Sequence, residues 1–293
     1  MPNANTYLLV TTAAFFWGAN FLLGGYVIHD IPPLWAAAIR FVLGAMLMFA
    51  IAGVKRENLF VPLRKHLGIY VMLGVVGIVG FNLFFFYALR YTSANNAALI
   101  MATNPLLTTL LAMVMLGESP TLRHLVALPV ALAGVAVVVT HGNPLALQLS
   151  VGDMLMLGAD VFWALYNVLC RRYMPQASPL VNTTWIMAAG AAVLLCVALG
   201  SDAQVAALGA KATVSMAVMA IGGTVLAYLF WSMGIARLGA ARTAIFLNLV
   251  PVFAMLLGAA IDASPTASQL AGGLLVLGGV TISMLPGRRP AAA

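Results

Sequence analysis

Two ionisable side chains lie inside long apolar stretches, far from other charges. Arg40 is the basic residue deep in such a stretch, and Asp160 is the acidic one. If the stretches cross a bilayer, an isolated charge there costs about 3 kcal/mol on insertion scales, so each needs a partner or water. Three interpretations follow: a structural ion pair between Arg40 and Asp160, a carboxylate clamp at Arg40, and proton coupling at Asp160. The ion pair is favoured.

Two tryptophans, Trp17 and Trp163, lie at matching places 146 residues apart, each directly after a phenylalanine. Paired indole rings can stack on an aromatic or cationic small molecule. The alternative is that each ring packs against other helices or lipid. Both lie about ten residues from either end of their stretch, which argues against the aromatic belt at membrane surfaces. We therefore expect both indoles to line a cavity.

Amide and aromatic side chains accompany these indoles. Asn20 and Asn167 follow Trp17 and Trp163 by three and four residues, so each amide shares a helical face with its indole. Buried amides link neighbouring helices or face the polar groups of a substrate, and aromatic stripes also serve packing. The further candidates for substrate contact are Phe81, Asn82, Phe85, Asn104, Tyr166, Tyr228, Trp231 and Asn248.

Two prolines, Pro105 and Pro251, interrupt apolar stretches at matching positions. Because proline lacks a backbone donor and its ring clashes with the preceding turn, it kinks or breaks a helix. Broken helices are tolerated in a bilayer where protein or a water-filled cavity satisfies the freed groups. We predict that both prolines are hinges, with Asn104 and Asn248 beside them at a cavity.

Signatures of enzyme active sites, metal sites and nucleotide-binding loops are missing from the sequence. The four histidines fall in or beside predicted loops, without the spacing of metal ligands. Cys170 and Cys196 are expected near opposite membrane faces, too far apart for a disulfide. No cofactor is expected. The net charge of +7 is scattered over short connections, which argues against nucleic acid as a partner.

The elements that carry these residues are predicted to be membrane-spanning helices. Hydrophobic residues make up 63% of the 293 residues and charged residues only 7%, whereas soluble domains have about 25% charged residues. A spanning helix needs about 20 apolar residues. Ten stretches qualify: 6–28, 33–53, 67–89, 93–116, 121–140, 151–171, 179–200, 213–236, 240–261 and 266–285. The predicted fold class is an all-α integral membrane protein with ten transmembrane helices.

Lysine and arginine are distributed unequally between the two sides that ten spans define. Eleven lie on the side of the N-terminus, and only Arg90 and Lys211 lie on the other. The positive-inside rule then predicts that both termini are cytoplasmic. The N-terminus lacks the basic region and cleavage site of a secretory signal, so we expect the first helix to insert uncleaved.

The two halves of the chain repeat each other at the same offset of 146 residues, which also matches Gly77 with Gly223. We predict two units, residues 1–145 and 146–293. Each unit holds five spans, an odd number, so the second unit must be inverted relative to the first. Inverted repeats suit alternating access, in which two similar halves exchange inward and outward shapes around a central site.

Small residues are frequent in the fifth and tenth spans. Gly134 and Gly279 occupy matched positions there, after a slip of one residue. Small side chains let membrane helices approach closely, so we expect these glycines to serve helix packing.

Several longer motifs occur in both halves. The first half contains FFWGANF (15–21), PLWAAAIR (33–40), residues 88–118 and residues 125–139, with weaker second copies at 161–168, 236–257 and 270–282. These motifs resemble the drug/metabolite transporter superfamily, in its ten-helix branch with two EamA-type repeats. The chain looks most like the bacterial exporters of aromatic and other amino acids. The resemblance implies an inner-membrane exporter whose cavity is lined mainly by helices one, three, four, six, eight and nine.

We therefore predict a secondary transporter that exports amino acids and related small metabolites across the inner membrane by alternating access. An exporter of cationic or aromatic drug-like compounds, held by Trp17 and Trp163, is the alternative within this class. A membrane channel or an integral-membrane enzyme is the alternative from another class. The expected partners are a small-molecule substrate and membrane lipid, and a monomer is favoured.

Overall fold

The computed structural model describes residues 4–117, 122–140, 143, 150–205, 209–238, 245–261 and 264–284. The regular elements in these ranges are all helices, with no strand among them. This confirms the predicted helical class. The starts of the predicted fifth and ninth spans, at residue 121 and residues 240–244, lie outside the described ranges, as does residue 285.

Seven helices are long and apolar enough to cross a membrane, judged by length and composition. They are Asn5–Asp30, Pro33–Val54, Phe60–Ala88, Ala94–Leu116, Val151–Tyr173, Pro179–Leu199 and Ala210–Trp231. Shorter apolar helices, at 129–138, 246–259 and 267–279, lie within the other three predicted spans. The chain is thus consistent with a multi-pass membrane protein, and the count of ten spans stays a prediction.

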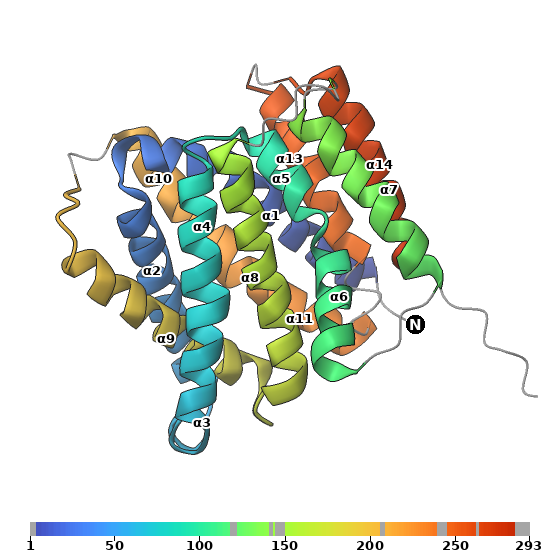
Figure 1. The fold of residues 1–293 in the computed structure, drawn as a ribbon. Helices are drawn as coiled ribbons and strands as arrows, with labels where there is room; N and C mark the ends of the chain where they lie inside the picture. Colours follow the sequence, from blue (N-terminus) through green and yellow to red (C-terminus); the bar gives the residue numbers. More distant parts are fainter. Residues whose placement is uncertain are drawn as a thin grey trace, which may run out of the picture.

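The first half of the chain forms helices α1 to α7 (Figure 1). Their bounds are α1 Ala4–Asp30, α2 Pro33–Val54, α3 Phe60–Leu73, η1 Gly74–Gly80, α4 Phe81–Ala88, α5 Ala94–Met101, α6 Asn104–Leu116 and α7 Leu122–Val139. The second half forms α8 Val151–Tyr173, α9 Pro179–Leu199, α10 Ala210–Val218, η2 Met219–Leu226, α11 Ala227–Leu238, η3 Ile245–Asn248, α13 Leu249–Ala259 and α14 Ala267–Met284.

One helix in each half contains a wide π-helical turn. The turn η1 joins α3 to α4, and η2 joins α10 to α11. Gly77 lies in η1 and Gly223 lies in η2, so the matched glycines fall in matched turns. A Cβ atom at Gly77 would collide with the Tyr166 ring on α8, and one at Gly223 would collide with the Asn20 amide on α1. Both turns therefore need glycine because a helix of the other half lies against them.

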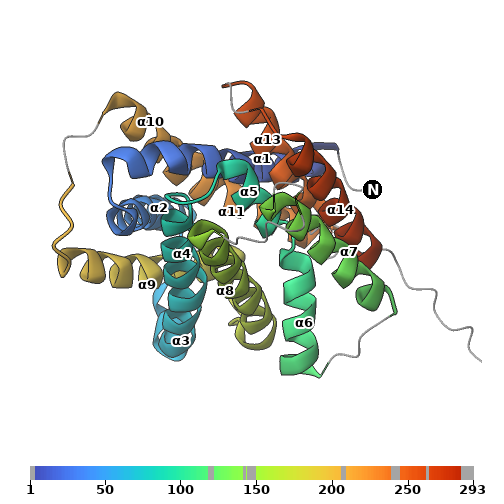
Figure 2. The ribbon, with the colours of Figure 1, turned by 45° about the horizontal axis from the view of Figure 1, so that its top comes forward.

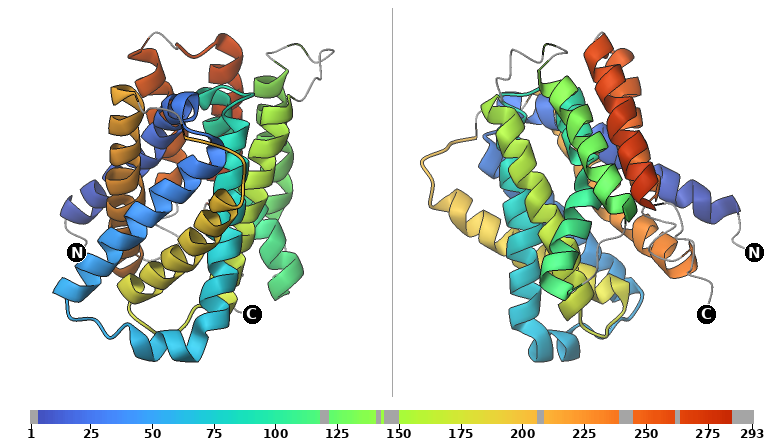
Figure 3. Two further views of the ribbon diagram at one scale, coloured as in Figure 1. Left: turned by 90° about the vertical axis from the view of Figure 1, so that its left-hand side faces the viewer. Right: turned by 45° about the vertical axis from the view of Figure 1, so that its right-hand side comes forward.

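The two halves pack into each other rather than side by side. Helix α1 packs against α11 and α13, α2 against α9, α4 against α8, and α7 against α14. Figures 1 and 2 show α7 and α14 as a pair at one edge of the bundle, with α2 and α9 at the other edge. The two further views show the same interleaving, with α1 crossing the bundle near α10 and α13 (Figure 3). Residues near the centre therefore come from both halves.

The glycines of α7 and α14 bring the two helix backbones into contact. A Cβ atom at Gly134 would lie 2.6 Å from the Gly272 carbonyl oxygen, and one at Gly279 would lie 2.8 Å from the Ala127 carbonyl oxygen. Side chains at these positions would force the helices apart. The predicted role of Gly134 and Gly279 in close packing is confirmed.

The helix that carries Pro105 is broken, as predicted. Helix α5 ends at Met101 and α6 begins at Asn104, which places Pro105 in the first turn of α6. Pro251 lies in the first turn of α13, directly after the short 3-10 helix η3. Proline is tolerated in a first turn because its missing N–H has no intrahelical acceptor there. Both prolines thus lie in the first turn of a new helical segment.

Serine side chains fix the starts of α5, α8 and α9. Ser93 accepts a hydrogen bond from the Asn96 N–H, and Ser178 accepts one from the Val181 N–H. At α8, Ser150 and Asp153 form a reciprocal capping box. The Thr92 hydroxyl also donates to Asp153 over 2.6 Å, which ties the start of α8 to the loop before α5.

Candidate functional site

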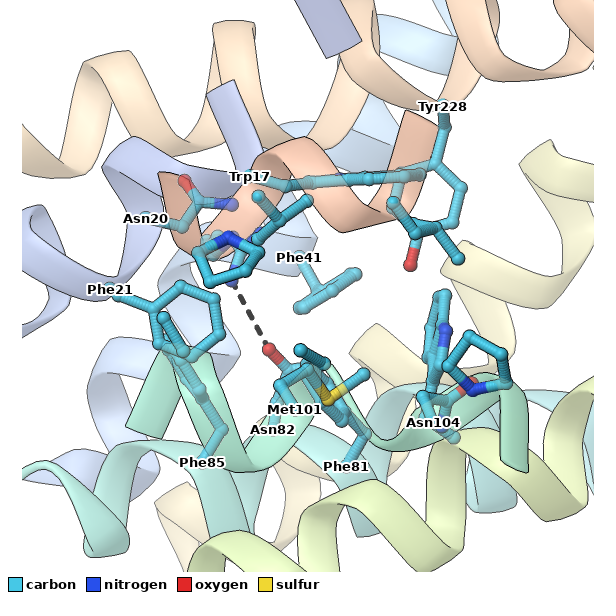
Figure 4. Close-up of a pocket in the computed structure, with 18 residues that line it drawn as sticks. Trp17, Asn20, Phe21, Phe41, Phe81, Asn82, Phe85, Met101, Asn104 and Tyr228 are labelled. Carbon is cyan, nitrogen blue, oxygen red and sulfur yellow. Dashed lines mark hydrogen bonds between the residues drawn. The ribbon is translucent and has the colours of Figure 1, made fainter. Parts of the chain in front are cut away.

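A cavity lies at the centre of the bundle, with an empty volume of about 740 Å³. Helices of both halves contribute to its walls, which Figure 4 shows at close range. The lining residues are Trp17, Asn20, Phe21, Arg40, Phe41, Phe81, Asn82, Phe85, Ala98, Met101, Ala102, Asn104, Pro105, Trp163, Tyr228, Leu247, Val250 and Pro251.

The two tryptophans lie in one aromatic wall. Tyr228 contacts both, with ring centroids 5.8 Å from Trp17 and 6.2 Å from Trp163. On the side of α4, Phe81 lies 5.2 Å from Trp163 and stacks on Phe85 at 5.7 Å. Edge-to-face and offset contacts of this kind hold rings in fixed orientations. A planar apolar group can therefore lie against a preformed surface.

Carbonyl groups of the two wide turns orient two of the lining side chains. The Trp17 indole N–H donates to the Gly223 carbonyl oxygen in η2, over 3.1 Å. The Asn82 amide donates to the Ile78 carbonyl oxygen in η1, over 2.9 Å. Wide turns often occur at functional sites because they disrupt the regular hydrogen-bond ladder of the helix.

Arg40 presents the positive charge of the cavity wall. It is 4% exposed. Its Nε donates to the Thr224 hydroxyl over 2.9 Å, and its Nη1 donates to Asn82 Oδ1 over 3.2 Å, the bond drawn as a dashed line in Figure 4. Its guanidinium carbon also lies 5.2 Å from the ring centroid of Phe41. Neutral groups thus hold the guanidinium, while its Nη2 donates to none of the described residues.

The favoured ion pair between Arg40 and Asp160 is not formed. Asp160 is 0% exposed; its carboxyl group accepts a hydrogen bond from the Asn104 amide over 2.6 Å, and its Oδ2 lies 2.8 Å from the Thr103 hydroxyl oxygen. Among the described residues the one ion pair joins His29 to Asp30. Each of the two side chains is instead hydrogen-bonded to neutral groups. These groups come from distant parts of the sequence, so the spacing of residues along the chain could not predict them.

Four of the predicted substrate-contact residues do not line the cavity. Trp231 packs on Trp17 with ring centroids 5.0 Å apart, and Tyr166 packs on Trp163 at 5.1 Å. Asn167 donates to Asn104 Oδ1 over 3.2 Å, so it supports a lining residue from behind. Asn248 has a buried Oδ1 without a hydrogen-bond partner. The structure thus places these residues behind the wall or beside it.

The other predicted residues are brought together at the cavity. The structure places Trp17, Asn20, Phe81, Asn82, Phe85, Asn104, Trp163 and Tyr228 on its wall, together with both prolines. Asn20 is 5% exposed, and its Oδ1 has no hydrogen-bond partner. A buried acceptor without a partner is costly.

Several lining residues were missed in the sequence. Phe21, Phe41 and Met101 are the large ones, and α2 was not among the helices expected to line the cavity. Phe21 follows Trp17 by four residues, and Phe41 is the neighbour of Arg40, so helical spacing and proximity to the buried charge were usable signals. Within the described part of the chain, no group of three or more potential metal ligands is present.

Comparison with known proteins places the chain in a family. The profile of the EamA-like transporter family matches it twice, over residues 4–140 and 150–285. The uncharacterized transporter YyaM of Bacillus subtilis is 38% identical over 96% of this chain and 93% of that protein. The aromatic amino acid exporter YddG of Ancylobacter novellus is 25% identical over 99% of this chain and 100% of that protein.

The fold has also been observed experimentally. A solved crystal structure superposes with a TM-score of 0.72, at 23% identity, over 98% of this chain and 99% of that one. The two matches to the family profile cover nearly the whole sequence and assign the chain to a family, and the solved structure agrees in fold. The chain belongs to the EamA-like transporter family, within the drug/metabolite transporter superfamily.

Proposed function

We propose that the protein exports amino acids and related small metabolites across the inner membrane by alternating access. The observation that carries this proposal is the central cavity, whose wall combines aromatic rings with Arg40, a cation that has no acidic partner among the described residues. An aromatic or apolar side chain fits against the rings. A carboxylate fits the free Nη2 group of Arg40, because guanidinium groups bind carboxylates through strong charge-assisted hydrogen bonds.

An amino acid would present one further group to this cavity. Its ammonium is a donor, and Asn20 Oδ1 is an acceptor without a hydrogen-bond partner within the described ranges. In this proposal the aromatic rings contact the side chain of the amino acid, Arg40 binds its carboxylate, and Asn20 binds its ammonium. The relationship to an aromatic amino acid exporter, at 25% identity, supports the same substrate class.

Transport by alternating access rests on the inverted repeat. The family profile matches once in each half, and the wide turns and helix-starting prolines recur at matched positions. In our proposal residues 1–145 and 146–293 each contribute five spans, both termini are cytoplasmic, and Pro105 and Pro251 serve as paired hinges. The two halves then exchange shapes around the cavity.

The cavity argues against a cationic substrate. Arg40 lines it, and no acidic side chain of the described residues does. A cationic drug-like compound would meet charge repulsion there and would rely on the indoles alone. Transport of such a compound in preference to amino acids would support the alternative exporter.

Counterflow in proteoliposomes tests the proposal. Vesicles loaded with unlabelled amino acid, one of the twenty at a time, should take up the labelled form with saturation and a steep temperature dependence. Flux that does not saturate would indicate a channel. Absence of flux for all twenty would remove the proposed substrate class.

A further inference from the structure

Asp160 is a buried carboxyl group that the binding of substrate does not use. It lies on α8, three residues before Trp163, and does not line the cavity. Its contacts go to the break between α5 and α6. Thr103 precedes α6 and Asn104 is the first residue of α6; the side chains of both lie within hydrogen-bond distance of the Asp160 carboxyl group.

The Thr103 hydroxyl lies within hydrogen-bond distance of two oxygen atoms but has only one hydrogen to donate. The Thr103 oxygen lies 2.8 Å from the Ile100 carbonyl oxygen and also 2.8 Å from Asp160 Oδ2. A hydroxyl has one hydrogen, and a carbonyl oxygen can only accept. If Thr103 donates to Ile100, the second contact is a hydrogen bond only when Asp160 Oδ2 carries the proton. A protonated Asp160 therefore satisfies every contact, whereas an ionised one competes with Ile100 for a single hydrogen.

Among the described residues, no charged side chain forms an ion pair with Asp160. Helices α5 and α6 and the turn η1, which all pack against α8, carry no titratable side chain. The titratable groups on the other packed elements and on α8 itself are Tyr87 of α4, Arg64, Lys65, His66 and Tyr70 of α3, and Asp153, Tyr166, Cys170, Arg171, Arg172 and Tyr173 of α8. Within the part of the chain that the structure describes, the side-chain hydrogen bonds of Asp160 involve Thr103 and Asn104 alone.

The carboxyl group is linked to the cavity through Asn104. Asn104 lines the cavity, and its Oδ1 accepts from Asn167 and from the Thr108 hydroxyl, over 3.2 and 3.1 Å. A charge on Asp160 would attract the Asn104 amide and pull the Thr103 hydroxyl away from Ile100. Both residues lie at the break, so the change would alter how α5 and α6 are joined.

The other half of the molecule lacks this group. At the offset of 146 residues the position that matches Asp160 is Ala14, on α1. Helix α1 packs against α13, whose first turn holds Pro251. The two breaks thus differ: the first is contacted by a titratable carboxyl group, and the matching position of the other half holds alanine.

We propose that Asp160 is a proton-binding site that controls the junction of α5 and α6, with the proton bound in the conformation seen here. Loss of the proton draws the Thr103 hydroxyl and the Asn104 amide to the Asp160 carboxylate and breaks the hydrogen bond from Thr103 to Ile100, so that the end of α5 can move relative to α6. Coupling of that movement to export rests on the proposed function, whereas proton binding and movement of the junction do not. The proposal can therefore fail or hold separately from the choice of substrate.

Infrared difference spectroscopy of the purified protein tests the bound proton without a substrate. The wild type at neutral pH should show the C=O stretch of a protonated carboxylic acid, and that band should be lost on titration to alkaline pH. Asp160→Asn should abolish the band. Asp153→Asn is the matched control, since Asp153 is the other buried carboxyl among the described residues, and it should leave the band unchanged. A wild-type spectrum without the band, or a band that survives in Asp160→Asn, would overturn the assignment.

Hydrogen–deuterium exchange of residues 94–116 tests the effect on the junction. Exchange in the wild type should rise with pH more steeply than in Asp160→Asn, whose amide mimics the protonated acid in both contacts. The intrinsic pH dependence of exchange cancels in this comparison. Thr103→Val should remove the steeper response and Thr103→Ser should restore it. Equal pH profiles for the wild type and Asp160→Asn would show that Asp160 does not control the junction.

Discussion

At the scale of single residues, the cavity is defined by which polar groups still lack partners. Arg40 is held by Thr224 and Asn82, and these bonds aim it without neutralising its charge. Asn20 keeps a buried acceptor free. Unpaired buried groups cost free energy in the empty protein, so a ligand that pairs with them gains that energy on binding.

Substitution of Arg40 should weaken binding of carboxylate substrates. Arg40→Gln keeps a group that can bond to Thr224 and Asn82 but removes the charge. Hydrogen bonds to charged groups contribute about 1.5–3 kcal/mol, so the KM for phenylalanine counterflow should rise by about 10- to 100-fold. Arg172→Gln is the control, because Arg172 is exposed and donates to the Met115 carbonyl away from the cavity.

A substrate analogue without a carboxylate tests the contact between Arg40 and the substrate by changing the substrate instead of the protein. Phenylalaninamide lacks the carboxylate, so it should compete poorly with phenylalanine in the wild type. The two ligands should compete about equally in Arg40→Gln. Unchanged discrimination in the variant would show that Arg40 does not bind the carboxylate.

Loss of an indole should weaken binding while leaving the protein folded. Aromatic contacts contribute about 0.5–1.5 kcal/mol beyond buried area, so Trp17→Ala or Trp163→Ala should raise the KM for phenylalanine about tenfold. Trp185→Ala is the matched control, because Trp185 packs on Phe49 outside the cavity. Wild-type kinetics in both cavity variants would refute the assigned wall.

At the scale of helices, the breaks and the close contacts have different roles. The α7–α14 pair is joined backbone to backbone and shares no residue with the cavity wall. The α5–α6 break lies on that wall. We expect substitutions in the α7–α14 pair to change the stability of the fold and substitutions at the α5–α6 break to change the rate of turnover.

Alanine at Gly134 should destabilise the bundle. Its Cβ would lie 2.6 Å from the Gly272 carbonyl oxygen and 2.7 Å from the Val276 nitrogen, and neither atom can move without its helix. Overpacking of this kind costs about 1–3 kcal/mol, which should lower the melting temperature in detergent. Gly278→Ala is the control, because a Cβ there meets nothing within 4 Å. Equal melting temperatures would contradict the close contact.

Replacement of Pro105 should slow turnover. Alanine supplies the N–H that proline lacks and favours a continuous helix through the break. The expected result in counterflow is a several-fold lower kcat with little change in KM. Pro129→Ala is the control, since Pro129 lies inside α7 and outside the cavity. A kcat equal to that of the wild type would argue against the hinge.

At the scale of the whole molecule, the orientation of the chain remains a prediction that labelling can test. Residue 57 follows the basic pair Lys55 and Arg56, on the side expected to be cytoplasmic, and Tyr91 lies on the opposite side. In a variant without native cysteines, Tyr91→Cys should react with a membrane-impermeant maleimide in intact cells. Glu57→Cys should react only after lysis. The reverse pattern would invert the topology.

Much of this architecture could be predicted from the sequence because apolar length, helix breakers and repeat matches are local signals. They located the helices, the break before Pro105 and most of the aromatic wall. The partners of Arg40 could not be predicted, since Thr224 lies 184 residues away and comes close only through packing of the two halves. The same holds for Tyr166 and Trp231, which share a face with wall residues but lie one layer behind them.

The wide turns also determine where the chain can tolerate a change in length. A π-helical turn contains one residue more than an α-helical turn, so deletion of one residue from η1 or η2 can be absorbed as an ordinary turn. The side chains beyond it would still face the cavity. Each residue of an α-helix advances the face by about 100°, so the same deletion within α4 or α11 would turn Phe85 or Trp231 away from its present neighbours. Single-residue deletions should therefore preserve transport at these two turns and abolish it a few residues further along.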